Sequence, residues 1–339
     1  MTTIADIVRE TGLARTTVAE ILRDKPGYND KTRKRVQQAA KRLNYRPNFL
    51  SKALSGGKSM TVGVLSASLE TETTNNRLFA IESAAQQAGY LAYLTGWGDH
   101  EGRGMKQYLQ DLLDRRVDGL IIHREVPFER DVEATLAQLS IPVVYLDTPP
   151  NDGDLAVHLT RSKAIETLAV YLASLGHRRA AFVLSPYHFH HPQRRADLIR
   201  QACLQTGITL EPLTDWMIPA GHYDARQISE IYYNMFRAKS LPTALLVSND
   251  SFALAAIHAL RKLGLTVPKD ISVVGFDDLP FSSLVDPAIT TVRQPGAEMG
   301  RRAFELLLEK MNHPDKQIAS DAFGCELIIR ESTGPATTK

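Results

Sequence analysis

Two short stretches of the sequence contain residue types that could do chemistry by themselves. Residues 54–59 read LSGGKS, in which GGKS could end a phosphate-binding loop and LSGG could belong to an ATPase signature. A phosphate loop of the form G-x-x-x-x-G-K-[ST] also needs a glycine at position 52, which is Lys52, and a strand before the loop with a helix after it. Here a helix-like segment comes first and an apolar strand follows, so neither nucleotide-binding interpretation holds.

The second stretch, YHFHH at residues 187–191, could bind a metal ion through its histidines. Adjacent and alternate histidines on one loop rarely supply three ligands, and no cysteine or carboxylate stands near them in the sequence. Cys203 and Cys325 show no metal-ligand spacing. The dinucleotide motif G-x-G-x-x-G and the hydrolase motif G-x-S-x-G are also absent. We therefore expect no metal, no cofactor and no enzymatic activity.

Charge is distributed unevenly along the chain. Residues 1–58 contain 13 Lys/Arg and 5 Asp/Glu, whereas the rest contains 27 and 33. A basic segment attached to a mildly acidic body indicates nucleic-acid binding at one end. No apolar run reaches the roughly 18 residues that span a membrane, and the first residues, MTTIADIVRE, lack an apolar signal core. We expect a cytoplasmic protein.

The basic segment is predicted to form three short helices. Thr3 followed by Asp6 is a capping-box pattern that starts the first helix, and Gly12 ends it. Apolar residues at helical spacing in RTTVAEILRD (15–24) predict the second helix. Asn29 is expected to cap the third, which ends near Asn44.

Two helices around a tight turn, the second with a polar face, predict a helix-turn-helix. Arg15 could donate two hydrogen bonds to guanine, Thr16 could contact either edge of a base pair, and Glu20 could accept from cytosine. Lys31, Arg33, Lys34 and Lys41 are available for DNA phosphates. A small helical docking domain is the alternative.

From Met60 onward, short branched runs such as TVGVLS, YLAYLT, GLIIH, PVVYLD, AAFVLS, TALLVS and SVVGFD alternate with amphipathic segments. This alternation predicts parallel sheets with helices on both faces. So many strands exceed one open sheet, which predicts two α/β lobes. Ligands in such folds bind beyond the carboxyl ends of the strands.

Several longer motifs make the reading more specific. The head segments TIADIVRETGLARTTVAEIL and NDKTRKRVQQAAKRLNYRPNFLSKAL resemble the lactose/galactose repressor (LacI) family of transcription regulators. LASLGHRRAAFVLSP, PTALLVSNDSFALAAIHALRKLGLTVPKDISVVGFDD and ITTVRQP in the body resemble it too. The resemblance implies an all-α helix-turn-helix head (1–46), a hinge helix and linker (47–59), and a body (60–339) of two Rossmann-like lobes of the periplasmic-binding-protein type.

The resemblance also implies a function. A homodimer, or a tetramer built from two dimers, would bind a near-palindromic operator in double-stranded DNA, most simply as a repressor. A sugar or sugar derivative bound between the lobes would alter operator affinity. A transcription activator of the same family stays open, and a solute-binding protein or an α/β enzyme is a weaker alternative.

The resemblance places DNA contacts on the head and hinge. The expected residues are Thr3, Arg15, Thr16, Thr17, Glu20, Asn29, Lys31, Arg33, Asn48, Lys52 and Leu54. Asn48 would cap the hinge helix, and Leu54 would enter the minor groove as a wedge that kinks the DNA. Ala14 and Glu20 depart from the family's usual Ser and Arg, which predicts an unusual operator.

The resemblance likewise places the effector site between the lobes. Its expected residues are Thr73, His191, Arg195, Trp216, Asn249 and Asp277. The segment TETT (71–74) replaces an apolar wall with a polar one, and Lys163 with Arg161 adds positive charge. We therefore expect the effector to be a sugar, a sugar acid or a sugar phosphate, with the anionic forms favoured by the added charge.

Overall fold

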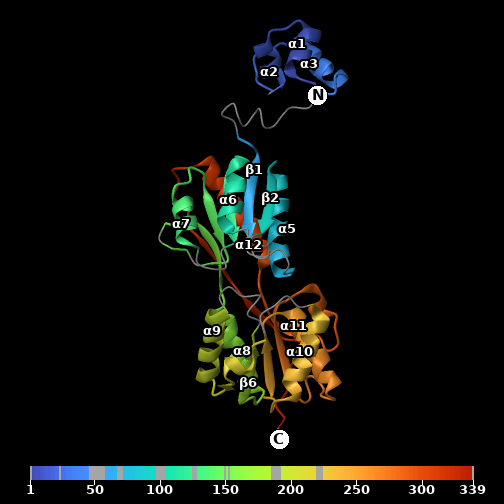
Figure 1. Cartoon of the computed structure of the whole chain (residues 1–339), viewed down its shortest axis with the longest axis vertical. Coiled ribbons are helices and arrows are strands. Elements are labelled where there is room, and N and C mark those ends of the chain that lie inside the picture. Colours follow the sequence, from blue (N-terminus) through green and yellow to red (C-terminus); the bar gives the residue numbers. More distant parts are fainter. Residues whose placement is uncertain are drawn as a thin grey trace. The chain divides into compact units, whose positions relative to one another are not determined.

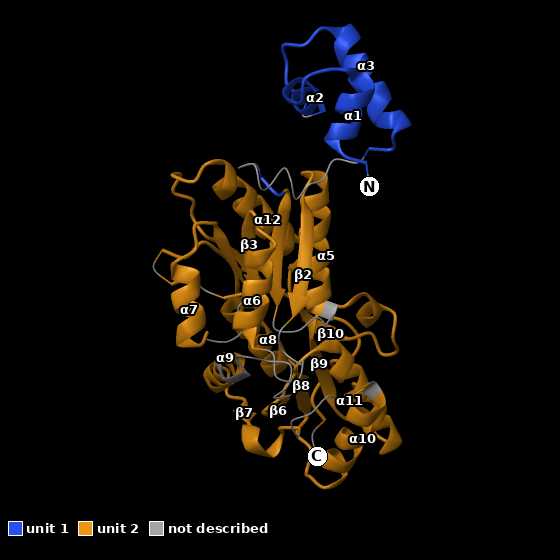
Figure 2. Cartoon of the chain, turned by 45° about the horizontal axis from the view of Figure 1, so that its top comes forward, with its two compact units in different colours: residues 1–59 blue, residues 60–339 orange. Residues whose placement is uncertain are grey.

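The computed structural model describes residues 2–22, 24–45, 58–66, 72–96, 104–123, 128–148, 150–151, 153–184, 192–218 and 224–337. The chain divides into two compact units, Met1–Ser59 and Met60–Lys339 (Figure 2). The predicted hinge residues Asn48, Lys52 and Leu54 and the predicted ligand residue His191 lie outside the described residues.

The first unit contains the three predicted helices: α1 (Ile4–Thr11), α2 (Arg15–Leu22) and α3 (Asp30–Arg42). Apolar residues at helical spacing meet in one small core made by Ile7, Val18, Ile21, Val36 and Ala39. Gly12 ends α1 with φ 63°, and Asn44 follows α3 with φ 48°. Left-handed backbone of this kind ends helices, which explains both predicted stops.

The second unit contains two lobes, each built on a six-stranded sheet (Figure 1). The first sheet has the order β11-β5-β4-β3-β1-β2, and its strand pairs are parallel. Its strands are β1 (Thr61–Ser66), β2 (Leu91–Gly96), β3 (Gly119–His123), β4 (Val143–Leu146), β5 (Ala156–Thr160) and β11 (Asp321–Gly324). Its helices are α5 (Glu72–Gln87), α6 (Met105–Asp114), α7 (Arg130–Ala137) and α12 (Gly296–Asn312).

The second sheet has the order β12-β10-β9-β8-β6-β7, and only the β10–β12 pair is antiparallel among the pairs described. Its strands are β6 (Arg179–Val183), β7 (Thr209–Leu210), β8 (Ala244–Val247), β9 (Ser272–Asp277), β10 (Thr290–Arg293) and β12 (Glu326–Ile328). Its helices are α8 (Ser162–Ser174), α9 (Pro192–Gln205), α10 (Ala225–Arg237) and α11 (Asp250–Lys262), with short 3-10 turns η1 (Leu213–Asp215) and η2 (Pro280–Ser283). The two-lobe α/β prediction is confirmed.

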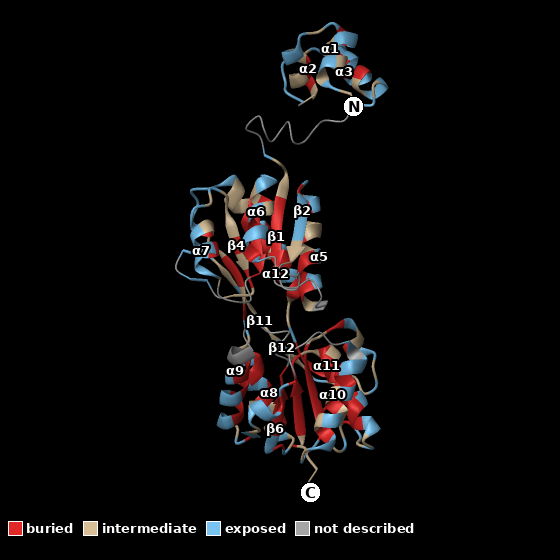
Figure 3. Cartoon of the chain, viewed as in Figure 1, coloured by how far each residue is buried: buried red, intermediate tan, exposed pale blue. Residues whose placement is uncertain are grey.

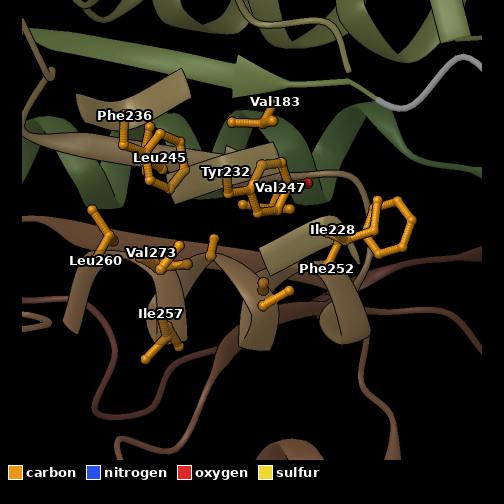
Figure 4. Packing of buried hydrophobic residues seen from close by; sticks show 14 of the residues in the cluster. Val183, Ile228, Tyr232, Phe236, Leu245, Val247, Phe252, Ile257, Leu260 and Val273 are labelled. Carbon is orange, nitrogen blue, oxygen red and sulfur yellow. The ribbon is translucent and has the colours of Figure 1, made fainter. Parts of the chain in front are cut away.

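Helices cover both faces of each sheet, so the central strands are buried (Figure 3). Alternate side chains of β1 show how: Val62 and Val64 pack with α5 and α12, while Leu65 packs with α6 and α7. In the second lobe, α10 and α11 cover one face and α8 and α9 the other. Figure 4 shows Tyr232 and Phe236 of α10 packed beside Leu245 and Val247 of β8. Burial on both faces accounts for the continuous apolar runs in the sequence.

The chain passes between the lobes three times. It leaves β5 for α8 at Arg161, leaves β10 for α12 at Gln294, and leaves β11 for β12 at Cys325. The Cys325 N–H donates to the Thr160 carbonyl oxygen (3.3 Å), which ties two of these crossovers together. The carboxyl ends of both sets of parallel strands therefore meet where the chain crosses.

Candidate functional site

The first candidate site is the exposed side of α2 in the head. Val18 and Ile21 are buried, whereas Arg15 and Thr16 are exposed. The amphipathic pattern read from the sequence thus separates the core side of α2 from a polar side. Thr17 is half-buried. Arg15 and Thr16 are thus the fully exposed members of the base contacts predicted on α2.

Glu20, which is half-buried, is tied to the loop after α2. Its carboxylate accepts hydrogen bonds from Lys25 Nζ (3.1 Å) and from the Tyr28 hydroxyl. The bond to Glu20 raises the pKa of Tyr28, because ionising the phenol would place two negative charges together.

Three other predicted DNA residues have structural roles in the head. The Asp6 carboxylate accepts from both the backbone N–H and the hydroxyl of Thr3 (2.9 Å each), which forms the predicted start of α1. Asn29 Oδ1 accepts from Thr32 N–H (2.8 Å) and caps α3 as predicted. Arg33 bonds Asp24 (2.9 Å) and the Lys25 carbonyl oxygen (2.7 Å), so its guanidinium holds the turn before α3.

The lysines that are expected to contact DNA phosphates have exposed side chains. Lys31, Lys34 and Lys41 are all exposed on α3, and Lys58 is exposed at the end of the first unit. Exposed lysines of this kind contribute the sequence-independent part of DNA affinity.

The second candidate site is a cluster of charged and polar side chains where the two lobes meet, which we call the interlobe cluster. Its residues follow or end the parallel strands, lie on the crossovers, or come from the helices packed beside them. They are Thr73, Arg77, His123, Asp147, Arg161, Arg195, Asp277 and Gln294.

Asp147, directly after β4, is the centre of this cluster. Its carboxylate pairs with Arg77 (Nη1 to Oδ2, 3.1 Å) and with Arg161 (Nη2 to Oδ1, 2.9 Å). Burial alone would raise the pKa of Asp147, but attraction to Arg161 and then Arg77 outweighs burial and holds the pKa well below its usual range. Asp147 is therefore an anion at neutral pH.

Two further residues connect Arg77 to the strands around it. His123 Nε2 lies 3.2 Å from Arg77 Nη1, and its Nδ1 lies 3.2 Å from Ser66 Oγ. Gln294 Oε1 accepts from Arg77 Nη2 (3.1 Å) and from Arg161 Nη2 (3.4 Å). The Gln294 amide nitrogen donates to Asp277 of the other lobe, so this one side chain links the two lobes.

Arg195 and Asp277 form the part of the cluster that belongs to the second lobe. Arg195 is buried, donates to the Ser248 carbonyl oxygen (2.8 Å) and lies over the Phe276 ring (4.8 Å). Burial, followed by repulsion from Arg161, lowers the pKa of Arg195 to about 10. Burial also raises the pKa of Asp277, which accepts a hydrogen bond from Thr73 across the lobes. The predicted residues Thr73, Arg195 and Asp277 therefore come together.

Two other predicted effector residues have structural roles in the second lobe. The Trp216 ring is buried in the second-lobe core, with its centroid 6.2 Å from that of Phe236 and 5.5 Å from Lys239 Nζ. Its contact with an effector stays a prediction. Asn249 caps α11, because its Oδ1 accepts from Phe252 N–H (2.7 Å). Lys163 is exposed on α8.

Sequence reasoning overlooked four members of the cluster: Arg77, His123, Asp147 and Gln294. A signal was available for two of them, because GLIIH and PVVYLD were recognised as strands and end in His123 and Asp147. Among the described residues, no group of three or more His, Cys, Asp or Glu side chains could hold a metal ion. No helix in the described part of the chain is long and apolar enough to cross a membrane.

Comparison with known proteins identifies the kind of protein that the two parts of the chain resemble. Residues 3–48 match the family model "Bacterial regulatory proteins, lacI family", and residues 169–333 match "Periplasmic binding protein-like domain". The chain is 27% identical over 333 residues to the HTH-type transcriptional repressor PurR of Pasteurella multocida, covering 98% of each chain. It is 28% identical over 342 residues to the probable HTH-type transcriptional repressor ExuR of Bacillus subtilis, covering all of both chains.

The fold agrees over the same length. A crystal structure of the Lac repressor dimer bound to operator and the anti-inducer ONPF is similar with a TM-score of 0.85 and 26% identity, covering 98% of this chain and 99% of that one. The resemblance read from the sequence motifs is confirmed. The chain carries the DNA-binding segment of the lacI family of bacterial regulatory proteins in residues 3–48, and over nearly its whole length it is similar to transcriptional repressors with that segment.

Proposed function

We propose that this chain is an effector-responsive transcriptional repressor, acting in the cytoplasm and without enzymatic activity. It binds a near-palindromic operator as a homodimer, through Arg15 and Thr16 of each α2, and the lysines of α3 bind phosphates. The interlobe cluster is the observation that carries the proposal. Buried charges from both lobes and two crossovers converge there, and a ligand touching them would change how the lobes sit.

The relatives support the regulatory part of this proposal. PurR of Pasteurella multocida and ExuR of Bacillus subtilis are named as repressors, and the Lac repressor structure holds both an operator and a small molecule. Operator affinity would depend on the ligand because binding at one site changes the population of body conformations that favours DNA at the other. The hinge helix predicted at residues 47–59 would transmit the change.

A second copy of the chain is supported by the first lobe itself. Phe79 on α5 and Leu91 on β2 are 73% and 65% exposed, and β2 is an edge strand of its sheet. Exposed apolar side chains beside an unpaired strand edge favour association. A dimer places two heads on one DNA, which explains why a palindrome is expected.

The proposal is tested by selecting DNA from a random library with the full chain. We expect an enriched site with two inverted half-sites, bound at least a thousandfold more tightly than random duplex, as is usual for specific protein–DNA complexes. Recovery of DNA without a shared sequence would contradict the proposal.

A further inference from the structure

Arg77, which is buried, and Arg161, which is half-buried, share one carboxylate. Both pair with Asp147, and their side chains are 4% and 22% exposed. Removing a charge from water costs several kcal/mol unless a counter-ion compensates it. Among the described residues, these two cations and one anion leave a single positive charge on this side of the interlobe cluster.

His123 does not supply the missing anion. An imidazole ring is either neutral or cationic, so it cannot balance a guanidinium charge. Its Nε2 lies 3.2 Å from Arg77 Nη1 and 3.7 Å from Asp147 Oδ2, and its Nδ1 lies 3.2 Å from Ser66 Oγ.

The carboxylates of the second lobe are engaged elsewhere. The Asp277 carboxylate is attracted by the charge of Arg195 and accepts hydrogen bonds from Thr73 and Gln294. Behind it, Asp250 accepts from Thr291 (2.6 Å), Ser282 (2.7 Å) and Leu279 N–H (2.9 Å). Neither carboxylate forms a hydrogen bond or an ion pair with Arg77 or Arg161 in the part of the chain that the structure describes.

Gln294 occupies the position that an anion would take. Its neutral Oε1 accepts from Nη2 of both Arg77 and Arg161. The adjacent Nε atoms of both arginines are buried and have no hydrogen-bond partner within the described part of the chain. Nε and Nη2 form one edge of a guanidinium, and that edge fits the two oxygens of a carboxylate.

We propose that the effector is a sugar acid carrying one carboxylate, which binds the Nε/Nη2 edges of Arg77 and Arg161 and replaces the side-chain oxygen of Gln294. This inference rests on the proposed function, of which it names the ligand class. One carboxylate matches the single surplus charge, whereas a phosphate dianion exceeds it. Arg77 is the residue that distinguishes the acid from the neutral sugar.

The exchange also has a consequence for the lobes. Gln294 lies on the crossover between β10 and α12 and donates to Asp277 of the second lobe. When the ligand carboxylate takes both arginines, Gln294 loses its two contacts with the first-lobe side of the cluster. The hydrogen-bonded link between the lobes that runs through Gln294 is then broken and replaced by the ligand.

The test is thermal unfolding of the full chain with matched pairs of probes: glucose against glucuronate, galactose against galacturonate, and glucose 6-phosphate. We expect at least one of the two acids to raise the midpoint by several degrees while its neutral parent leaves it unchanged. The phosphate should give a smaller shift than that acid. Calorimetric titration then gives the dissociation constant of the acid that binds.

Variants separate the carboxylate contact from general stability. Arg77→Met should weaken the acid at least thirtyfold, and Arg77→Lys, which keeps the charge but lacks the two-donor edge, should weaken it about tenfold, since each tenfold step is about 1.4 kcal/mol. Arg200→Met is the matched control, because Arg200 is an exposed arginine of α9 that pairs with Asp197 (2.6 Å). It should bind the acid as the wild type does. Circular dichroism checks that each variant is folded.

An exchange variant tests the position of Gln294. Gln294→Glu combined with Asp277→Asn moves a carboxylate onto the two arginines and keeps an amide–carboxylate pair between positions 294 and 277. This double variant should fold, and its thermal unfolding midpoint should be higher than that of the wild type. The sugar acid should no longer raise the midpoint, because a carboxylate already contacts the two arginines. The inference is overturned if neither acid raises the unfolding midpoint, or if a neutral parent or the phosphate raises it more than the acid does. It is also overturned if the Arg77→Met variant binds the acid normally, or if the acid still raises the midpoint of the exchange variant. DNA selection is an independent readout, so its failure would overturn the proposed function and leave the acid-binding result standing.

Discussion

Arg15 and Lys34 are both exposed cations of the head, yet they should affect DNA binding in different ways. Arg15 stands on α2, where a guanidinium can bond two acceptors of guanine, whereas Lys34 stands on α3 and is expected at phosphate. Arg15→Ala should reduce affinity for the selected operator by about 1–3 kcal/mol and leave random DNA nearly unchanged. Lys34→Ala should weaken both equally. Fluorescence anisotropy on the two DNAs measures this, and equal losses for both variants would disprove the assignment.

Asp250 makes stability depend on pH. Burial, followed by repulsion from Asp277, raises the pKa of Asp250 to about 7, from an ordinary value of 3.8. The folded chain therefore holds this proton more tightly than the unfolded chain, and the resulting stabilisation is complete below pH 4 and is lost as the pH rises to 7. The loss is about 1.4 kcal/mol per pH unit in that window.

Asp250→Asn removes this titration and serves as the reference. The free energy of unfolding of the wild type, minus that of the variant, should fall between pH 4 and pH 7 when both are unfolded in urea. Parallel pH curves for the two proteins would show that Asp250 is ionised throughout.

At the residue scale, the site residues that could be predicted from the sequence are those that belong to recognisable motifs. Arg195 and Asp277 were found in this way and meet in the interlobe cluster. Arg77 was missed, because one arginine on an amphipathic helix is indistinguishable from a solvent-facing charge until the packing of α5 is known. The burial of Trp216 was not foreseen for the converse reason, since it depends on Phe236 and the rest of a core that the local sequence does not specify.

At the scale of elements, the contact between α5 and α12 sets where Arg77 stands. A Cβ atom at Gly300 would lie 2.3 Å from the Arg77 carbonyl oxygen, and one at Gly296 would lie 3.4 Å from Arg77 Cγ. Gly300→Ala therefore forces α12 away from α5. We expect it to lower the free energy of unfolding by about 1–3 kcal/mol, as overpacking does.

Urea unfolding followed by tryptophan fluorescence measures the effect, because both tryptophans, at positions 97 and 216, lie in the body. Gly104→Ala is the matched control, since a Cβ there meets nothing within 4 Å and φ is −76°. It should change the free energy of unfolding by less than about 0.5 kcal/mol. A Gly300→Ala variant as stable as this control would contradict the close contact.

Elements with strong local patterns were predicted well. The seven apolar runs quoted from the sequence correspond to β1, β2, β3, β4, β6, β8 and β9. The strands β5, β7, β10, β11 and β12 were not identified, and they are short or lie at or near the edges of the sheets. β11 pairs with β5 more than 150 residues away, so its position is decided by tertiary pairing rather than by its own sequence.

At the scale of the whole molecule, the exposed apolar residues of the first lobe should control assembly. Leu91→Glu places a charge on the edge strand β2, where burial against a second copy would then leave the charge desolvated. The dissociation constant of the dimer should rise at least tenfold in sedimentation velocity. Val170→Glu is the control, because Val170 is also exposed (60%) but lies on α8 of the other lobe. Equal effects of both variants would argue against β2 as the interface.

The central claim is that a small molecule at the interlobe cluster controls operator binding by the head. The most direct measurement is the affinity of the full chain for its selected operator, by fluorescence anisotropy, with and without a saturating sugar acid. We predict a change of at least fivefold in the wild type, within the usual range of allosteric coupling, and none in Arg77→Met at the same acid concentration. An operator affinity that the bound acid leaves unchanged in the wild type would contradict the account.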